Sequence, residues 1–326
     1  MKRGCVIGYD INEKGCQISY YDDSMEEPDT MMASSNNYLI PLVLGYFKDR
    51  WVFGKEAKRL AVVGEDCTET DLYEKAKRRE KVSLAGKTYD AVWLLAKYIS
   101  LTLQDFENIQ YLTFTTPETD VDMAKMLKGI GQHIGVDKEI INVQDYKESF
   151  CQYMIFQPKE LWQYESALFY CDEDRIKAYM LRRLRVDASH GMNSFVTVDE
   201  VANAQRKELE ALYPIMNKEK SPDESFKSMI ENVFEKKVIS SVYLTGEGFE
   251  KNWYPNSLRV LCNGRRAFMG NNLYSKGACY KSIRKCEPND DGPIYLDETK
   301  LTERICLRMR VDGQEGWYPL VTWGTH

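Results

Sequence analysis

Runs of apolar residues divide the chain into short strands and amphipathic helices. β-Branched and aromatic residues flank an Asn/Gly turn at residues 12–15, which predicts a β-hairpin over residues 4–21. Residues 90–106 carry apolar side chains at helical spacing, and residues 109–116 form a continuous apolar run typical of a buried strand. Strands that alternate with helices in this way favour the α/β class.

The first half continues with a predicted helix, a short strand and a second helix, at residues 118–134, at residues 139–143 and from Tyr146 onward. A second hairpin is then predicted around the acidic turn Asp172-Glu173-Asp174. Its two strands, two following helices and a third strand are predicted at residues 165–170, 175–181, 199–216, 221–236 and 238–245. The order of elements therefore recurs in the two halves.

Two glycine-containing turns follow the last of these strands. Gly246-Glu247-Gly248 comes directly after the strand, and Gly270-Asn271-Asn272 opens a helix of small residues. Glycine at a strand end lets a ligand approach the backbone N–H groups, so the two turns are candidates for binding one nucleotide. A tight strand-to-helix connection without a ligand is the alternative.

The character of the chain changes after Cys286. A Pro/Asn/Asp/Gly linker at residues 288–293 is followed by alternating segments at residues 294–296, 303–311 and 317–323. Three such strands without a closing element expose a sheet edge. Either this segment pairs with the rest of the chain, or it is the start of a β domain that continues beyond His326.

Composition and charge narrow the function classes. The chain has 326 residues, 43% hydrophobic and 29% charged, which predicts a globular protein of about two domains. A net charge of −6 provides no positive field for nucleic acid. The nine cysteines and three histidines show no metal-site spacing, and no run of 18 apolar residues occurs, so we expect a soluble, cytoplasmic protein with reduced thiols and no membrane contact.

The order of these motifs resembles the actin-like ATPase superfamily, and within it most closely the nucleotide-binding domain of DnaK-type heat-shock chaperones. The resemblance covers roughly residues 1–285 and is carried, besides the glycine turns, by residues 5–10, 17–21, 40–46, 51–58 and 112–117. It implies an α/β fold of two ribonuclease-H-like halves that face a nucleotide cleft, with a short C-terminal β segment.

The implied halves span residues 1–162 and 163–286, and the β segment spans residues 287–326. A small insertion subdomain is expected in the first half at about residues 38–85. A helical insertion is expected in the second half at about residues 195–237.

In this family the first hairpin turn is a phosphate loop. Asp10 matches the aspartate that orients magnesium-bound water, which makes it the candidate catalytic and metal residue, and Gly8 and Asn12 are candidate phosphate contacts. The family shows Gly and then Thr or Ser where this chain has Asn12-Glu13. The Glu13 carboxylate adds negative charge beside the phosphates, so a plain surface hairpin is the alternative.

Two further catalytic candidates come from the resemblance. Ala76-Lys77-Arg78 resembles the Ala-Lys-Arg of the chaperones, whose lysine reaches the γ-phosphate, although a solvated helix face explains Lys77 as well. Asp145 stands where the chaperones carry the Glu of a Glu-Pro-Thr motif, and helix N-capping is its alternative role.

The second phosphate loop departs further from the family pattern Asp-Leu-Gly-Gly-Gly-Thr. Tyr170 falls at the aspartate, and acidic residues replace the glycines. The other nucleotide-contact candidates are Lys227, Glu231, Gly246, Glu247, Gly248, Phe249, Gly270, Asn271 and Gly277.

The resemblance therefore implies a degenerate ATPase. It would bind ATP or ADP with Mg²⁺ weakly, as a switch, and hydrolyse ATP slowly or not at all, in a chaperone- or assembly-related role with a protein partner or client. Two alternatives stay open. One is a non-enzymatic scaffold with an empty cleft, and the other is a sugar-kinase-like phosphotransferase, for which no sugar-binding Asp or Asn set can be singled out.

Overall fold

The computed structural model describes residues 4–34, 37–63, 67–184, 194–205, 221–286, 292–297, 305–311 and 314–321. The chain forms two compact units. The first unit comprises Met1–Tyr153 and Asn271–Asp290, and the second comprises Met154–Gly270 and Asp291–His326. The segment after Gly270, which the sequence assigned to the second half, thus belongs to the first unit.

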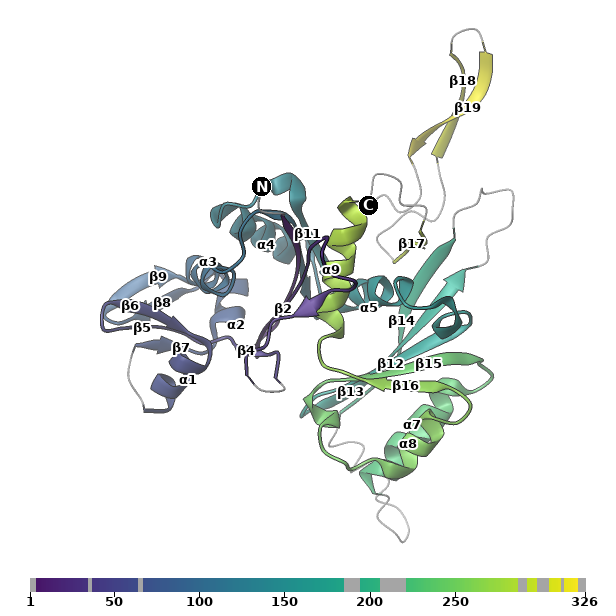
Figure 1. Ribbon diagram of the computed structural model, residues 1–326, viewed down its shortest axis with the longest axis horizontal. Helices are drawn as coiled ribbons and strands as arrows, with labels where there is room; N and C mark the ends of the chain where they lie inside the picture. The colour runs from purple at the N-terminus through teal and green to yellow at the C-terminus, as the bar shows by residue number, and fades with distance from the viewer. Residues whose placement is uncertain are drawn as a thin grey trace. The chain divides into compact units, whose positions relative to one another are not determined.

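The first unit is built on a six-stranded sheet with the order β11-β10-β1-β2-β3, and β4 also pairs with β2 (Figure 1). Strand β1 is antiparallel to β2 and parallel to β10, which in turn is parallel to β11. The bounds are β1 (Cys5–Ile11), β2 (Gly15–Tyr21), β3 (Asp29–Thr30), β4 (Ile40–Pro41), β10 (Ile109–Thr116) and β11 (Ile141–Asp145). The predicted hairpin and the predicted strand at residues 109–116 are confirmed.

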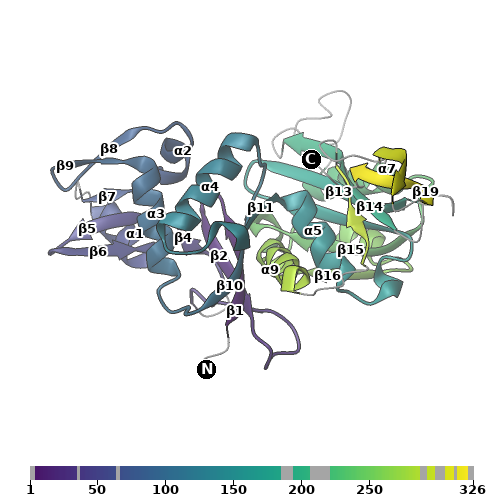
Figure 2. The same cartoon turned by 90° about the horizontal axis from the view of Figure 1, so that it is seen from above.

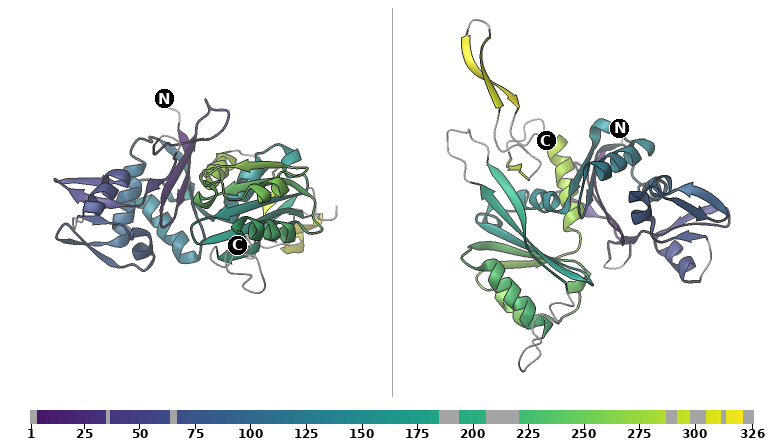
Figure 3. Two further views of the ribbon diagram at one scale, coloured as in Figure 1. Left: turned by 90° about the horizontal axis from the view of Figure 1, so that it is seen from below. Right: turned by 180° about the vertical axis from the view of Figure 1, so that it is seen from behind.

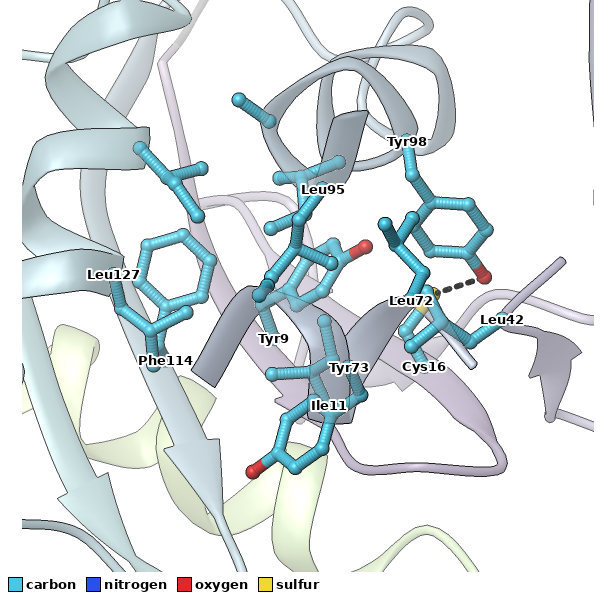
Figure 4. Close-up of a cluster of buried hydrophobic side chains, with 14 of the residues drawn as sticks. Tyr9, Ile11, Cys16, Leu42, Leu72, Tyr73, Leu95, Tyr98, Phe114 and Leu127 are labelled. Atoms are coloured by element: carbon cyan, nitrogen blue, oxygen red, sulfur yellow. Dashed lines mark hydrogen bonds between the residues drawn. The ribbon is translucent and has the colours of Figure 1, made fainter. Parts of the chain in front are cut away.

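Helices α3 (Ala91–Thr102) and α4 (Val121–His133) cover one face of this sheet. Each begins at an aspartate whose side chain accepts backbone N–H groups, Asp90 for α3 and Asp120 for α4. Their apolar faces meet the alternate residues of β1 and β10 that point the same way. Figure 4 shows this core, in which Tyr9 and Phe114 lie in edge-to-face contact, with ring centroids 5.5 Å apart.

Helices α5 (Tyr146–Ile155) and α9 (Leu273–Cys286) cover the other face, and α9 runs beside β1 and β2 in Figure 1. The contacts there are between small polar groups. The Ser275 hydroxyl lies 2.8 Å from that of Ser19, and the Ser282 hydroxyl lies 2.8 Å from that of Thr113. At Gly8 an added Cβ would lie only 2.1 Å from the carbonyl oxygen of Ser275, so helix and strand meet backbone to backbone.

A small αβ insertion lies between β4 and α3, as the sequence predicts (Figure 2). The insertion contributes Trp51 and Tyr89 to an aromatic cluster with Trp93 of α3, in which the Tyr89 and Trp93 rings lie 5.5 Å apart and nearly parallel. Its elements are β5 (Leu44–Phe47), β6 (Arg50–Phe53), α1 (Gly54–Val63), β7 (Thr68–Glu69), α2 (Leu72–Lys77), β8 (Lys81–Leu84) and β9 (Lys87–Asp90).

The second unit has a six-stranded sheet with the order β16-β15-β12-β13-β14-β17. As in the first unit, three consecutive antiparallel strands are followed by two strands that extend the sheet in parallel from the first of them. The bounds are β12 (Glu165–Cys171), β13 (Arg175–Leu184), β14 (Phe195–Gln205), β15 (Ile239–Thr245), β16 (Arg266–Met269) and β17 (Ile294–Tyr295). The chain is thus α/β, with two separate sheets of the same strand order.

Helices α7 (Pro222–Phe234) and α8 (Pro255–Leu261) lie on one face of the second sheet, where Figure 3 shows them in green. The predicted cap of α7 is confirmed, because the Ser221 hydroxyl accepts the N–H of Glu224. The described residues also include the short 3-10 helices η1 (Lys138–Ile140), η2 (Lys159–Leu161) and η4 (Glu247–Phe249).

The helix predicted over residues 199–216 is wrong as far as the structure describes it. Residues through Gln205 belong to β14, which pairs with β13 over its whole length around a bulge between Ala178 and Tyr179. Its first residues, Phe195, Val196 and Val198, are buried, and pairing with β13 outweighs the helical propensity of the sequence. Residues 206–216 lie outside the described part.

The predicted C-terminal strands are present. The first is β17, which pairs with β14, and the other two, β18 (Ile305–Val311) and β19 (Gln314–Val321), pair with each other as an antiparallel hairpin. Most of the predicted linker, residues 288–291, lies outside the described residues.

The backbone contact at Gly8 provides a stability test. We expect Gly8→Ala to lower the free energy of unfolding by about 3 kcal/mol or more, because its Cβ would meet the Ser275 oxygen at 2.1 Å and the Cys279 nitrogen at 2.2 Å. The matched control is Gly129→Ala in α4, whose Cβ would meet nothing within 4 Å and which should stabilise the helix by up to about 1 kcal/mol. Urea unfolding of both variants measures the difference, and a Gly8→Ala variant as stable as the parent contradicts it.

Candidate functional site

The carboxyl ends of three parallel strands meet at one edge of the first sheet. Asp10 pairs with Thr115, and Thr116 pairs with Asp145, so the ends of β1, β10 and β11 lie level with one another. Ligands of open α/β sheets bind outside the carboxyl ends of the strands. This edge brings together Asp10, Asn12 and Asp145 among the residues that the sequence singled out.

Asp10 lies in a group of four side chains, which we name the Asp10 cluster: Asp10, Asn12 and Tyr146 are joined by hydrogen bonds, and Tyr274 is joined to Tyr146 by ring stacking. The Tyr146 hydroxyl donates to Asp10 Oδ1 at 2.8 Å and accepts from Asn12 Nδ2 at 2.9 Å. The Tyr146 ring stacks on Tyr274, with centroids 3.7 Å apart and planes 6° from parallel. Tyr146 therefore holds the carboxylate through one hydrogen bond, and Asn12 and Tyr274 hold Tyr146.

The Asp10 carboxyl group is almost fully buried, with 4% of the residue exposed. Burial raises its pKa to about 7; the hydrogen bond from Tyr146 lowers the pKa, and the Glu13 carboxylate raises it. A magnesium-bound water needs a charged carboxylate, whereas burial disfavours the charge of Asp10 and its Oδ1 accepts the Tyr146 hydroxyl. The magnesium role that the resemblance assigns to Asp10 is therefore disfavoured and stays a prediction, because Oδ2 accepts no hydrogen bond from the described residues.

The turn after β1 is closed by its own side chain. Asn12 Oδ1 accepts the backbone N–H groups of Lys14 at 2.9 Å and Gly15 at 3.2 Å. Such an Asx turn satisfies the N–H groups locally, so these two do not point to a ligand. Asn12 thus stabilises the hairpin and, through its amide, positions Tyr146.

The second hairpin is closed in the same way. Asp172, the first residue after β12, accepts the N–H groups of Asp174 at 2.8 Å and Arg175 at 2.7 Å through one carboxylate oxygen. Asn12 and Asp172 occupy the same place, directly after the first strand of their sheets. The acidic turn is a closed hairpin turn and offers no row of N–H groups to a phosphate.

Lys77 ends α2, with its ammonium group 5.5 Å from the centre of the Tyr73 ring and 3.5 Å from Glu74 Oε1. Burial raises the pKa of Tyr73, and the charges of Glu13, Glu74 and Asp10 raise it further. Tyr73 therefore lies within electrostatic reach of the Asp10 cluster, and Lys77 lies beside Tyr73.

Asp145 caps a helix. Its Oδ1 accepts the N–H of Glu148 at 2.8 Å, which is the N-capping role that the sequence left open. Beside it, the Ser149 hydroxyl bonds Thr115 Oγ1 at 2.7 Å and accepts from Gln144 Nε2 at 2.6 Å. Gly277 serves packing here, because a Cβ would lie 2.0 Å from the Ser149 carbonyl oxygen.

The remaining candidates lie in the second unit or at its boundary. Gly246 has φ +101°, and a Cβ there would lie 2.1 Å from the Cys171 carbonyl oxygen; at Gly248 a Cβ would lie 2.3 Å from Cys171 Sγ. Contact with the end of β12 thus explains both glycines, so they are no sign of a ligand.

Phe249 is buried in the aromatic core with Phe226 and Trp253. Lys227 and Glu231 lie on α7 at half-buried and exposed positions. The Gly270 N–H donates to the Leu244 carbonyl at 3.1 Å, and Glu247 and Asn271 lie in η4 and just before α9.

Sequence reasoning did not single out Tyr146 and Tyr274 as site residues. Tyr146 is the first residue of α5 and Tyr274 the second residue of α9, and each helix follows a candidate turn or strand end, but the two residues are far apart in the chain. Their stacking depends on how α9 packs against α5, which no local pattern encodes.

The fold and the site define a mixed α/β chain whose candidate centre is a buried carboxyl group that accepts a hydrogen bond from a tyrosine. Residues 27–298 match the family described as "Family of unknown function (DUF5716) C-terminal". The match covers most of the chain, which therefore belongs to this family. No curated protein matches the chain.

No helix in the described ranges has the length and apolar character needed to cross a membrane. Among the same residues, no three His, Cys, Asp or Glu side chains gather closely enough to hold a metal ion.

The raised pKa of Asp10 predicts a pH-dependent stability. Between pH 3.8, the ordinary pKa of Asp, and about 7, Asp10 is protonated in the folded chain and ionised in the unfolded chain. Protonation of Asp10 therefore stabilises the folded state fully at low pH, and this contribution is lost as the pH rises through 7. We expect wild type to lose up to about 4 kcal/mol relative to Asp10→Asn between pH 4 and pH 8, since one pKa unit corresponds to about 1.4 kcal/mol.

Urea unfolding of both proteins across that pH range measures the effect. Tyr146→Phe is the second variant, because loss of its hydrogen bond removes a contribution that lowers the pKa of Asp10 and should move the midpoint to higher pH. If the free energies of unfolding of wild type and Asp10→Asn change with pH in the same way, the raised pKa of Asp10 is contradicted.

Proposed function

We propose that this chain is a degenerate member of the actin-like ATPase superfamily that acts by binding a protein partner and turns over ATP slowly or not at all. The shared strand order of the two sheets supports the fold part of the proposal. The closed hairpin turns support the functional part, because Asn12 and Asp172 each accept two backbone N–H groups that a phosphate loop would present to its ligand.

Catalysis of phosphoryl transfer depends on N–H groups, cations and a positioned water that stabilise the charge on the phosphates. The first hairpin has Glu13 and a buried Asp10 bonded to Tyr146, and the second has three consecutive acidic residues, Asp172, Glu173 and Asp174. Negative charge at both turns disfavours bound triphosphate. The chemistry of the site therefore favours a binding protein over an ATPase.

The hydrolysis rate tests this proposal. With saturating ATP and magnesium, we expect turnover well below about 1 s⁻¹, the low end of the ordinary enzyme range. Phosphate release from the purified chain is compared with release from Asp10→Asn, so that a contaminating ATPase appears as equal activity in both. Turnover at or above that rate that Asp10→Asn abolishes would overturn the proposal.

A second candidate function is an adenine-nucleotide switch without hydrolysis. The observation in its favour is Lys77, whose ammonium group lies 5.5 Å from the centre of the Tyr73 ring, because Tyr73 is itself within electrostatic reach of Asp10 and Glu13. The resemblance places the lysine that meets the γ-phosphate at Lys77. In this function ATP binds weakly and stabilises one conformation of the chain, and a protein partner or client binds that conformation selectively.

Thermal shift with ATP, ADP and AMP, with and without magnesium, distinguishes the two functions. A nucleotide at about a hundredfold excess over its Kd stabilises the fold by about 2.7 kcal/mol, which raises the Tm by a few degrees for a chain of this size. We expect magnesium to change the shift little, because the Asp10 carboxyl group is buried, has a raised pKa and is bonded to Tyr146.

Lys77→Ala should remove the difference between the ATP and AMP shifts while leaving the AMP shift intact. The matched control is Lys87→Ala, an exposed lysine in β9. The absence of a shift with every nucleotide would exclude the switch and favour the scaffold.

A further inference from the structure

A pocket of about 480 Å³ lies in the first unit, lined by residues of α3 and α4 together with Arg79 and Asp90. Both helices pack on the apolar face of the sheet, whereas Asp10 lies on the face that α5 and α9 cover. The lining includes the charged, aromatic and glycine residues Arg79, Asp90, Trp93, Lys125, Gly129 and His133. The volume is in the range of small-molecule sites.

The charged groups of the pocket leave a net positive charge. In the described part of the chain neither Arg79 nor Lys125 has an ion-pair partner. The pocket's carboxylate, that of Asp90, accepts the N–H groups of Val92 and Trp93 and lies 3.9 Å from the Lys81 ammonium group. The two cations Arg79 and Lys125 therefore exceed the one carboxylate of the lining, and the imidazole of His133 lies in the same wall.

Trp93 gives the pocket a rigid planar surface. It is 39% exposed although its ring stacks on Tyr89 and packs on Trp51, with centroids 5.5 and 5.8 Å away. An aromatic ring fixed by neighbours costs little entropy when it binds another ring, and a partly exposed tryptophan is a frequent anchor of ligands.

Gly129 is an independent sign of a ligand site, because the absence of a side chain there leaves the pocket unfilled. It lies in the interior of α4, where glycine costs about 1 kcal/mol relative to alanine. An added Cβ would meet nothing within 4 Å, so no packing contact requires the glycine. A side chain at this position would instead enter the pocket, of which Gly129 forms part of the wall.

We propose that this pocket binds a small anion attached to a planar apolar group, that is, an aryl phosphate monoester or an aromatic carboxylate. Arg79 and Lys125 bind the anion, and Trp93 packs against the ring. Arg79 adopts the left-handed conformation, with φ 54°, which is uncommon for arginine, and its N–H bonds the Ala76 carbonyl, so its backbone is fixed at the pocket edge.

Titration calorimetry at low ionic strength tests the site with two probes, phenyl phosphate and benzoate, since salt screens an exposed ion pair. We expect saturable binding of at least one probe, and the tighter probe tells the phosphate from the carboxylate source. Inorganic phosphate has only the anionic group and phenol only the ring. Each should bind at least about tenfold more weakly than phenyl phosphate, a loss of about 1.4 kcal/mol.

Three pairs of variants locate the binding. Gly129→Leu should fill the pocket and abolish binding, whereas Gly129→Ala should bind within a few-fold of wild type. Lys125→Ala should weaken binding about tenfold, whereas Lys128→Ala, which removes the same charge from an exposed position of the same helix outside the pocket, should not. Asp10→Asn should bind the probes as wild type does, whereas Trp93→Ala should bind them more weakly.

The melting temperature of each variant separates binding from folding, and Gly129→Leu should melt no lower than wild type. If that variant does not fold, Gly129→Met and Lys125→Ala decide the matter. The proposal is overturned if neither probe binds saturably at millimolar concentration, or if a folded variant with a filled pocket binds as tightly as wild type.

Discussion

The close approach of α9 to the first sheet is the contact on which the rest of the first unit depends. Cys279 donates to the carbonyl of Val6, 273 residues away in sequence, and the backbones of α9 and β1 meet at Gly8. A second backbone contact, at Gly277, holds α9 against Ser149 of α5. Neither glycine has room for a Cβ, so this packing tolerates no larger side chain, and a helix from the far end of the chain completes the fold of its beginning.

The short distance between α9 and β1 determines which side chains fit on the face of the sheet that α9 covers. Only small residues fit between strand and helix, and their hydroxyl groups must bond one another because water is excluded, as in the pairs Ser19–Ser275 and Thr113–Ser282. The opposite face has ordinary apolar packing under α3 and α4. Asp10 lies on the polar face, where burial makes its negative charge costly, and this accounts for both its raised pKa and its bond to Tyr146.

Features that depend on local sequence were predictable. Both hairpins, α3, α4 and the Ser221 cap follow from periodicity, turn residues and capping side chains. Features set by distant pairing were not: β14 is a strand because β13 lies beside it, and the Tyr146–Tyr274 stack joins two helices that only the fold brings together. Gly246 and Gly248 show the same limit, because a glycine that admits a ligand and one that admits the Cys171 backbone look alike in sequence.

The two hairpin turns show why fold and activity separate so readily in an architecture of this kind. The sheets are held by strand pairing and by the helices on their faces, and nothing in those contacts depends on what the turns present to solvent. Asn12 and Asp172 close their turns with the N–H groups next to them, which stabilises the hairpins and removes the groups that a phosphate would need. The pocket beside Trp93 belongs to α3 and α4 instead, so a ligand bound there makes no demand on either turn.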